Sequence, residues 1–313
     1  MSLCVGVLIN PRSRHLRHHP RAVERMRRIL GDRGLLVVTH DIEHVEEIAV
    51  RFRDAGVGVV GVVGGDGTAG VAVQAFSDVY GAEALPPFAL LRGGTMNTVA
   101  NGLGLARHKP ERNLRRLLAR TAGGVVPPSV ERRTIVAGGR CGFLFGTGVF
   151  RSFLDAYYAA GHDDPSAVTA VRTIARLAAS AFVQGPLIKR LGQPLRAVVE
   201  VDGERWPERD YLTHAIGTVP QVGLGFTPFY MADDHPDAFH FLAVHGRTFD
   251  VAADLWRVWL GRPLRPANAT GVVAREVAIH AHEDRVAYMV DGDLYTCDGP
   301  LRVTTGPAAR IVT

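Results

Sequence analysis

The chain has 313 residues, 47% of them hydrophobic and 21% charged, which is the composition of a globular protein with room for two domains. Its formal net charge is +5, but few aromatic residues lie near the arginines, so nucleic-acid binding is not expected. No run of 18 or more apolar residues occurs, which argues against a membrane-spanning helix. Three widely spaced cysteines, Cys4, Cys141 and Cys297, indicate neither a disulfide framework nor a metal knuckle and fit a reducing cytoplasm.

The first 105 residues alternate between strand-like and helix-like segments. The opening MSLCVGVLIN has an apolar run without a basic leader, which suits a first strand better than a signal peptide. We expect strands at residues 3–9, 35–40, 57–63 and 88–91, and helices at residues 21–30, 41–53 and 69–80, with a further helix after Asn97. This alternation predicts a doubly wound, mainly parallel α/β sheet whose strand-to-helix turns emerge at one carboxyl edge, where ligands bind.

The segment VGVVGVVGGDGTAGV at residues 57–71 predicts a phosphate site. A buried strand of Val and Gly leads into Gly64, Gly65, Asp66, Gly67 and Thr68, and a helix follows. Glycines allow backbone amides to approach an anion at the start of a helix. The Asp66 carboxylate cannot attract a phosphate directly, but it can hold a Mg²⁺ that does. Since glycine turns between strands and helices are common, a plain turn remains the alternative.

Two more turns at the expected edge carry polar groups: NPRSR at residues 10–14 and GGTMN at residues 93–97. They supply neutral hydrogen-bonding groups, and Arg12, Arg14 or Arg92 can offset negative charge. Three such turns on one edge predict a nucleotide site, with Asn10, Arg14, Gly64, Gly65, Gly67, Thr68, Gly94, Thr95 and Asn97 as its binding residues. The alternative is that Asn10 only ends a strand and Asn97 only begins a helix.

These three motifs, in this order, resemble those of the diacylglycerol kinase catalytic domain family, which includes bacterial soluble lipid kinases and sphingosine kinases and is related to NAD kinases. The resemblance covers the whole chain. It implies an α/β nucleotide-binding domain followed by a β-rich, sandwich-like domain, with ATP and Mg²⁺ as cofactors and a lipid as acceptor. It also implies that the chain's end, from Gly306 onward, returns to the first domain.

The second half of the sequence is typical of a β-rich domain. We expect strands at residues 133–137, 142–145, 195–201, 211–217, 239–244, 271–279 and 285–290. The double proline Pro127-Pro128 predicts a domain boundary, giving a first domain of residues 1–127 plus 306–313 and a second of residues 128–305. A helical insertion is expected at residues 150–160 and 165–191, and its apolar stripe either contacts a membrane surface or covers the sheet.

The resemblance also assigns roles to acidic residues of the second domain. The family's proposed general base lies in an Asp-Gly-Glu motif, and the matching run here is Asp291-Gly292-Asp293, so Asp293 would take the proton of the acceptor hydroxyl. The alternative is a hairpin turn at Asp291-Gly292 with a solvated Asp293. Asp237 matches an Asp-Gly pair that the family associates with a metal, although Ala238 replaces the glycine, and an acidic surface loop is the alternative.

The chain departs from the family pattern beside each motif. The Asn-Glu that commonly follows GGDGT-x is replaced by Gly70-Val71, the Asp after Gly-Thr-x-Asn is replaced by Thr98, and Arg14 replaces a glycine. Two carboxylates are therefore missing from the edge that would carry Mg²⁺. Histidines at positions 15, 18 and 19, and again at 280 and 282, have no partners at zinc-like spacing and are interpreted as exposed polar residues.

The hypothesis that follows is an ATP- and Mg²⁺-dependent kinase that phosphorylates a hydroxyl of diacylglycerol, a related lipid or a long-chain base. In it, Asp66 organises metal and phosphates, Asp293 is the base, and Asp66 and Asp237 are the metal candidates. The alternatives are a catalytically weak or inactive nucleotide-binding regulator at the membrane surface and, ranked lower, an NAD kinase. The expected partners are a lipid substrate, the membrane surface through peripheral contact, and a second copy in a homodimer, with a cytoplasmic or inner-membrane-surface location.

Overall fold

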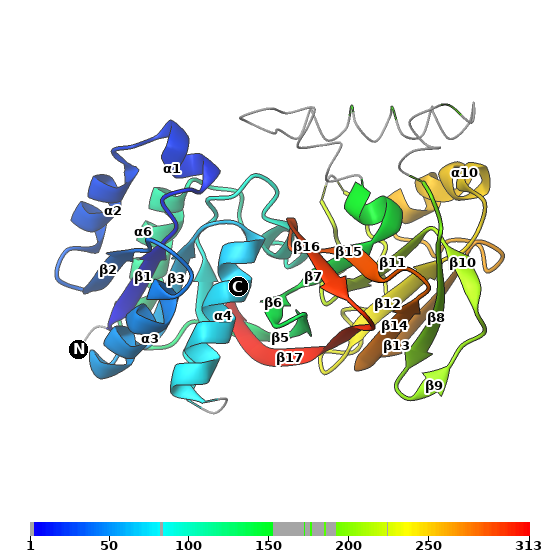
Figure 1. Ribbon diagram of the computed structural model, residues 1–313. Coiled ribbons are helices and arrows are strands. Elements are labelled where there is room, and N and C mark those ends of the chain that lie inside the picture. Colours follow the sequence, from blue (N-terminus) through cyan, green and yellow to red (C-terminus); the bar gives the residue numbers. More distant parts are fainter. Residues whose placement is uncertain are drawn as a thin grey trace. The chain divides into compact units, whose positions relative to one another are not determined.

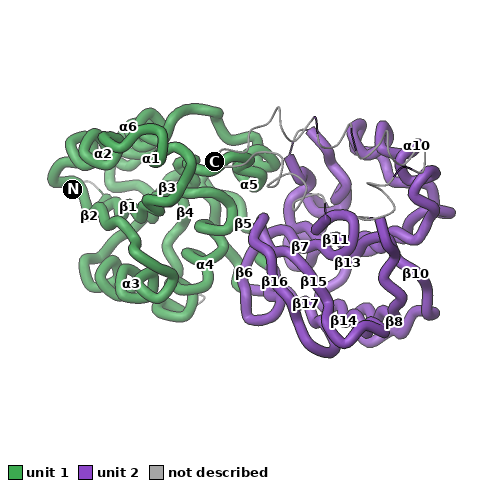
Figure 2. The backbone as a smooth tube through the Cα atoms, turned by 45° about the horizontal axis from the view of Figure 1, so that its top comes forward, with its two compact units in different colours: residues 1–134, 307–313 green, residues 135–306 purple. Residues whose placement is uncertain are grey.

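The computed structural model describes residues 3–81, 84–152, 192–223 and 225–313, together with residues 172, 176 and 185. The chain divides into two compact units, shown in different colours in Figure 2. Unit 1 comprises Met1–Thr134 and Pro307–Thr313, and unit 2 comprises Ile135–Gly306. The boundary expected from the sequence at residue 127 falls seven residues before the observed division at Thr134. Apart from residues 150–152, which are helical, and three single positions, the expected helical insertion lies outside the described residues.

Unit 1 is a parallel sheet with helices on both faces (Figure 1). Its strands β1 (Val5–Ile9), β2 (Gly34–Val38), β3 (Val59–Val63) and β4 (Phe88–Leu90) lie in the order β2-β1-β3-β4, and each neighbouring pair is parallel. Its helices are α1 (Arg14–His18), α2 (Ala22–Leu30), α3 (His44–Asp54), α4 (Asp66–Tyr80), α5 (Thr98–Gly102) and α6 (Pro110–Thr121). The predicted doubly wound α/β fold is confirmed.

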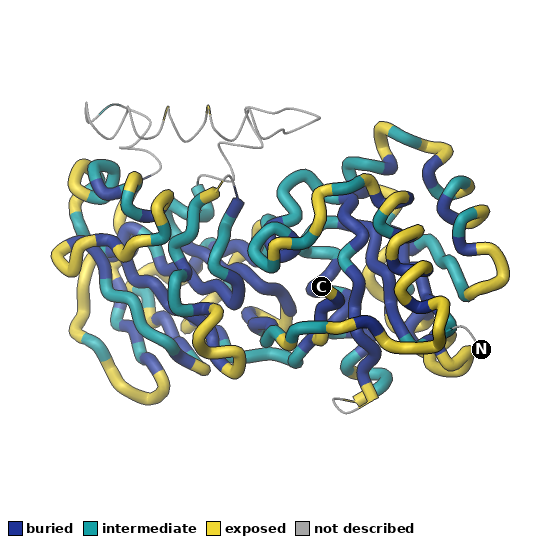
Figure 3. The backbone as a smooth tube through the Cα atoms, turned by 180° about the vertical axis from the view of Figure 1, so that it is seen from behind, coloured by how far each residue is buried: buried dark blue, intermediate teal, exposed yellow. Residues whose placement is uncertain are grey.

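The two faces of this sheet follow from the alternation of side chains along β1. Val5, Val7 and Ile9 belong to a core cluster that also contains the buried residues of α2 and α6. On the opposite face, Gly6 lies against Phe52 of α3, and a side chain at Gly6 would come within 2.4 Å of that ring. All residues of the two central strands β1 and β3 are buried, the class drawn dark blue in Figure 3.

Unit 2 is β-rich, as the sequence predicts. One antiparallel sheet has the order β13-β12-β11-β7-β15-β16; these strands are β7 (Leu144–Thr147), β11 (Thr213–Gly217), β12 (Phe239–Val244), β13 (Ala269–Ala274), β15 (Arg285–Val290) and β16 (Asp293–Asp298). A second antiparallel set contains β8 (Leu195–Val201), β9 (Glu204–Arg205), β10 (Arg209–Tyr211), β14 (Glu276–Ala281) and the first part of β17 (Leu301–Val312). Side chains from both sets, such as Val277 and Phe241, share one buried core, which makes the unit a sandwich.

The end of the chain passes from unit 2 into unit 1. In β17, Leu301–Thr304 pair with β14, whereas Ile311 lies opposite Phe88 of β4. Ile311 is fully buried, and the amide of Thr313 donates to the carbonyl of Pro128 at 3.1 Å. The strand β5 (Ser129–Ala137) crosses the division between the units at Thr134 and forms a hairpin with β6 (Arg140–Gly142).

Two expected strands are each two strands in the structure. The strand expected at residues 211–217 is split at Leu212 into β10 and β11, and that expected at 271–279 is split at Arg275 into β13 and β14, which belong to different sheets. The break at Arg275 is held by Asp202, whose carboxylate oxygen accepts the amide hydrogens of Arg275 and Glu276 at 2.9 and 2.8 Å. Unit 2 also contains the helix α10 (Thr248–Trp259), which the sequence reading did not include.

Two histidines lie fully buried in the larger sheet of unit 2. His214 of β11 has its ring Nδ1 3.1 Å from the Thr147 hydroxyl, while its Nε2 has no hydrogen-bond partner among the described residues. Within the described part of the chain, His240 of β12 has no hydrogen-bond partner at either ring nitrogen, and it packs edge-on against Tyr230, with ring centroids 4.7 Å apart. Among the helices that the structure describes, none is both long and apolar enough to cross a bilayer.

Candidate active site

The three predicted turns meet at the carboxyl edge of the unit 1 sheet. The Asn10 side-chain amide donates to the Thr68 hydroxyl at 2.9 Å, which joins the turn after β1 to the start of α4. The amides of Gly93 and Gly94 donate to the carbonyl of Gly64 at 2.8 and 2.9 Å, which joins the turns after β3 and β4. The turns are therefore parts of one hydrogen-bonded layer, although they lie far apart in the sequence.

The helix of the GGDGT motif begins earlier than expected. We expected it at Ala69, but α4 starts at Asp66 with Gly65 as its N-cap, so Asp66, Gly67 and Thr68 form its first turn. First-turn amides have no carbonyl partner within their own helix and carry the positive end of the helix dipole. This start places three amides of the motif where they can bind an anion.

The glycines of the second and third turns allow the two backbones to touch. A Cβ on Gly94 would lie 2.4 Å from the Cα of Gly65, and one on Gly64 would lie 2.4 Å from the Thr68 side chain. Neither contact leaves space for a methyl group. These residues are therefore required for the close packing of the turns, whatever else they bind.

Replacing Gly94 by alanine is expected to destabilise unit 1 by about 1–3 kcal/mol, because the new methyl group collides with backbone rather than with a flexible side chain. Gly123→Ala is the matched control, since a Cβ there meets nothing within 4 Å. Urea unfolding of both variants measures the difference. Equal stability of the two variants would contradict this account of Gly94.

Asp66 joins the second turn to the helix that follows the third. Its two carboxylate oxygens accept the amide hydrogens of Thr98 at 2.7 Å and Val99 at 3.0 Å, at the start of α5. Burial raises the pKa of the Asp66 carboxyl above its ordinary value, although the hydrogen bonds from Thr98 and Val99 act to lower it. Asp66 thus caps a helix more than thirty residues away in sequence, a role that the motif alone does not indicate.

The residues of the third turn bond mainly to one another. Asn97 has φ 48°, in the left-handed region, and its side chain both accepts from the Gly94 amide at 3.2 Å and donates to the Gly94 carbonyl at 2.8 Å. Arg92, considered above as a charge partner for a ligand, instead donates to Asn101 at 2.9 Å and to the Leu105 carbonyl at 2.7 Å. Thr95 is half-buried in the same turn. The Asn97 and Arg92 side chains therefore hold the shape of the turn.

The first turn ends in a short helix, α1, which was not among the helices expected from the sequence. Arg14 is the first residue of α1 and is half-buried, whereas Arg12 is exposed. The amide of His15 donates to the Gly93 carbonyl at 2.9 Å, so α1 is attached to the third turn. This attachment places Arg14 and its neighbours beside the glycine turns.

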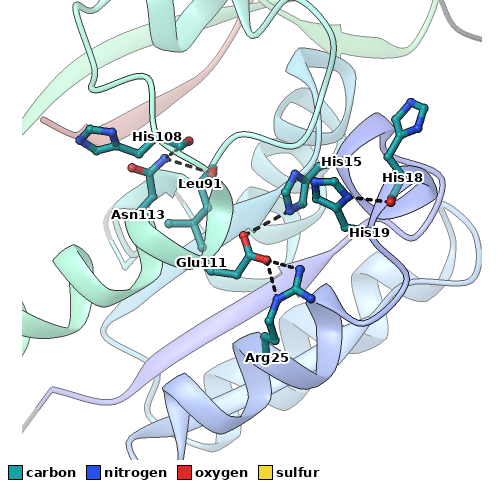
Figure 4. Close-up of polar contacts among 8 residues, drawn as sticks. All are labelled: His15, His18, His19, Arg25, Leu91, His108, Glu111 and Asn113. Carbon is teal, nitrogen blue, oxygen red and sulfur yellow. Dashed lines mark hydrogen bonds and ion pairs between the residues drawn. The ribbon is translucent and has the colours of Figure 1, made fainter.

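A buried carboxylate links α1 to α2 and α6 (Figure 4). Glu111, in the first turn of α6, accepts two hydrogen bonds from Arg25 of α2 at 2.7 and 3.1 Å, and its second oxygen lies 3.2 Å from Nε2 of His15. Burial would raise the pKa of Glu111, but the Arg25 hydrogen bonds and the nearby His15 bring it below its ordinary value. Glu111 was missed in the sequence, where Lys109-Pro110-Glu111 indicates only the start of a helix.

In unit 2, the two aspartates of the Asp-Gly-Asp run differ in their hydrogen bonds and exposure. Asp291 and Gly292 have positive φ of 48° and 97° and form the turn between β15 and β16. The Asp291 carboxylate accepts the amide hydrogens of Phe143 and Leu144 at 3.0 and 2.9 Å, which fixes the turn to the start of β7. Asp293 is exposed as a residue, yet partial burial of its carboxyl raises its pKa, against the opposing charge of Arg140.

The metal candidates of the sequence lie in different units. Asp66 is in unit 1, and Asp237 is an exposed residue of the turn before β12 in unit 2. Among the described residues, no group of three or more His, Cys, Asp or Glu side chains is arranged to hold a metal. His280 and His282 instead lie near Glu200 and Glu208, at 4.0 and 3.4 Å.

The Asp66 carboxylate nevertheless fits a Mg²⁺ whose other ligands come from a bound nucleotide. Its two oxygens offer about four lone-pair directions, of which the amides of Thr98 and Val99 take two and the Thr98 side chain takes one. A cation there would offset the burial that raises the pKa of this group. Mg²⁺ commonly takes one or two carboxylates together with phosphate oxygens and water, which is the coordination that this site can complete.

Comparison with known proteins agrees with this architecture. A Bacillus anthracis diacylglycerol kinase structure is 15% identical, with a TM-score of 0.64 over 99% of this chain and 97% of its own. Another structure from the same organism, provisionally described as a diacylglycerol kinase, is 16% identical with a TM-score of 0.69 over the same shares. An NAD kinase from Archaeoglobus fulgidus in complex with ATP has 10% identity and a TM-score of 0.49 over 99% of this chain and 93% of its own.

The two Bacillus structures show that both units have the fold of these bacterial proteins. A sequence search of curated proteins finds no match. The model of the diacylglycerol kinase catalytic domain matches residues 4–125, a segment that contains all three glycine and asparagine turns of unit 1. Residues 4–125, which carry the three turns, are therefore similar to the diacylglycerol kinase catalytic domain.

Proposed function

We propose that the protein is an ATP- and Mg²⁺-dependent lipid kinase that transfers the γ-phosphate to the hydroxyl of diacylglycerol, a related lipid or a long-chain base. The observation that carries the proposal is the layer of three turns, in which the glycine backbones pack together, Asp66 caps α5 and the first-turn amides of α4 remain available. This layer supplies amides that would bind phosphate oxygens directly and one carboxylate that would bind them through a metal.

In this proposal each motif has a separate task. The amides at the start of α4 bind phosphate oxygens, and the Asn10–Thr68 hydrogen bond keeps the first turn in place beside them. Mg²⁺, when bound at Asp66, would neutralise charge on the phosphate oxygens during transfer. Arg14 and Thr95 lie in the same turns and would contact the nucleotide.

Asp293 is proposed as the general base. The acceptor oxygen would attack the γ-phosphorus and give its proton to the Asp293 carboxylate, and ADP would leave. Two observations support this choice over Asp291: the Asp291 oxygens already accept backbone hydrogens, and the pKa of Asp293 is raised, which makes its carboxylate the stronger base.

Replacing Asp293 by asparagine is expected to lower the transfer rate by about 10²- to 10⁴-fold while ATP affinity stays unchanged, because only the proton acceptor is lost. Transfer is measured as label from γ-labelled ATP entering a mixed lipid extract in detergent micelles, and binding by calorimetry. Asp298→Asn is the matched control, since this exposed residue of the same strand only pairs with Arg285.

The same assay has a pH signature. Because the pKa of Asp293 is raised, the acid limb of kcat/KM should lie above the ordinary range of an aspartate, with activity falling as this base becomes protonated. Full transfer by the Asp293→Asn variant would remove Asp293 from the mechanism without affecting the nucleotide site.

Two observations favour the second candidate, a nucleotide-binding regulator without transferase activity. No cluster of three potential ligands exists among the described residues, and the two carboxylates expected beside the motifs are absent from the sequence. Such a regulator would bind ATP by calorimetry and give no labelled lipid with any acceptor in the extract.

A further inference from the structure

Helix α10 of unit 2 exposes an aromatic face. Trp256, Trp259 and Leu260 at its carboxyl end are 49%, 59% and 52% exposed, and Phe249 in its first turn is 45% exposed. Two of the three tryptophans of the chain thus lie on one peripheral helix, drawn in gold in Figure 1. Large apolar side chains gathered on an exposed surface usually mark a contact site.

The spacing of these residues puts them on one side of the helix. Phe249, Trp256 and Leu260 are separated by seven and four residues, so they fall within a narrow arc at 100° per residue. The opposite side is the buried one, since Asp254 and Val258 are buried and the Asp254 carboxylate accepts from the Asn268 side chain at 2.9 Å. The helix therefore packs on unit 2 by one side and presents the aromatic side outward.

The carboxyl end of α10 is anchored, which fixes the direction of this aromatic face. The amide and hydroxyl of Thr227 both donate to the carbonyl of Val258, at 3.1 and 3.0 Å. A Cβ on Gly225 would lie 3.3 Å from the Trp259 ring nitrogen, so the same turn also supports this side chain. The face is thus part of the folded unit rather than a frayed end.

Positive charge surrounds the aromatic face. Arg247 precedes the helix, Arg257 lies within it, with its guanidinium carbon 5.7 Å from the centre of the Trp256 ring, and Arg262 and Arg265 follow it. The acids of this segment are Asp250, which is exposed, and Asp254, which is buried and pairs with Arg265. Four arginines against two acids make the surroundings cationic.

We propose that the face formed by Trp256, Trp259 and Leu260 docks the protein on an anionic lipid bilayer. Indole rings favour the boundary between headgroups and acyl chains, and arginines beside them attract anionic headgroups. The proposal deepens the proposed lipid-kinase function, because an acceptor with acyl chains resides in a bilayer. A charge-complementary bilayer accounts for the arginines, whereas a purely apolar self-contact would not use them.

The test uses the full-length protein and vesicles of phosphatidylcholine with phosphatidylserine, without ATP and without diacylglycerol. Sedimentation measures vesicle binding, and brominated acyl chains report tryptophan insertion by quenching. The double variant Trp256→Glu with Trp259→Glu should bind at least about tenfold more weakly and lose its quenching. The matched control is Val125→Glu with Val126→Glu, which adds the same charge at exposed apolar residues of unit 1. Arg262→Glu should weaken binding to anionic vesicles alone.

Each outcome of this test either supports or overturns the proposed contact with the bilayer. Binding that requires both tryptophans and anionic lipid, with unchanged unfolding temperature in the variants, supports the proposal. Binding that survives the double substitution overturns it, as does a wild type that ignores vesicles but forms a dimer abolished by the same substitutions. Since no nucleotide is present, a negative result leaves the transfer assay in micelles, and with it the kinase proposal, unaffected.

Discussion

Replacing Asp66 by alanine is expected to abolish measurable phosphate transfer and to lower the free energy of unfolding by about 2–4 kcal/mol. The stability loss follows from the amides of Thr98 and Val99, which would each lose their acceptor, at about 1–2 kcal/mol for each partly buried group. Transfer should fall by more than about 10²-fold, because a small displacement of the phosphate-binding turns is enough to misalign the reacting atoms.

A matched aspartate separates this effect from ordinary helix capping. Asp41 also accepts a backbone hydrogen, from His44 at 2.8 Å at the start of α3, but it lies on the exposed surface. Asp41→Ala should cost about 1 kcal/mol and leave nucleotide binding intact. Calorimetry then tests the metal: ATP affinity should depend on Mg²⁺ in the wild type and not in Asp66→Ala. Equal Mg²⁺ dependence in both would show that Asp66 only holds α5.

Acid is expected to destabilise unit 2 by about 4 kcal/mol between pH 7 and pH 5. Burial lowers the pKa of His214 to about 3 and that of His240 to about 4, from an ordinary value near 6.5. Below pH 6.5, both histidines therefore bind a proton in the unfolded chain but stay neutral in the folded unit. Each histidine then costs about 1.4 kcal/mol per pH unit until its folded pKa is reached, or about 2 kcal/mol at pH 5.

His240→Phe isolates this effect, because the substitution would lose no hydrogen bond between a ring nitrogen of His240 and the residues that the structure describes. The quantity to compare is the difference between the free energies of unfolding at pH 7 and pH 5, which cancels any repacking cost common to both. It should be smaller by about 2 kcal/mol in His240→Phe than in the wild type. An unchanged difference in His240→Phe would show that His240 is not buried in its neutral form.

Much of the fold can be predicted from local patterns in the sequence. The strands at residues 195–201, 239–244 and 285–290 have the bounds expected from alternating apolar residues, because each has one face in the sandwich core. The break at Arg275 was not predictable in this way. The run from Gly271 to Ile279 is uniformly strand-like, and what divides it is a hydrogen-bond acceptor, Asp202, from a distant turn.

The candidate site shows the same division. The glycines and the strand before them predict where the turns lie, since both are local properties. The hydrogen-bond partners of Asp66 were not predictable, because Thr98 and Val99 belong to another helix. The sequence around an aspartate in a glycine turn does not indicate which distant amides it will accept from. Glu111 belongs to no motif; the packing of α2 beside α6 brings Arg25 to it, and α1 brings His15.

Because β17 ends in unit 1, this unit can be completed only after unit 2 has been synthesised. Ala309 and Ile311 fill buried positions in unit 1, and Arg310 donates to the Leu85 carbonyl at 2.7 Å, yet the ribosome delivers these residues only after the whole of unit 2. Until then, β4 has an open edge and the core beside it lacks its last side chains. Unit 1 is thus begun first and completed last, so a nascent chain cannot finish the sheet of unit 1 before unit 2 has been synthesised.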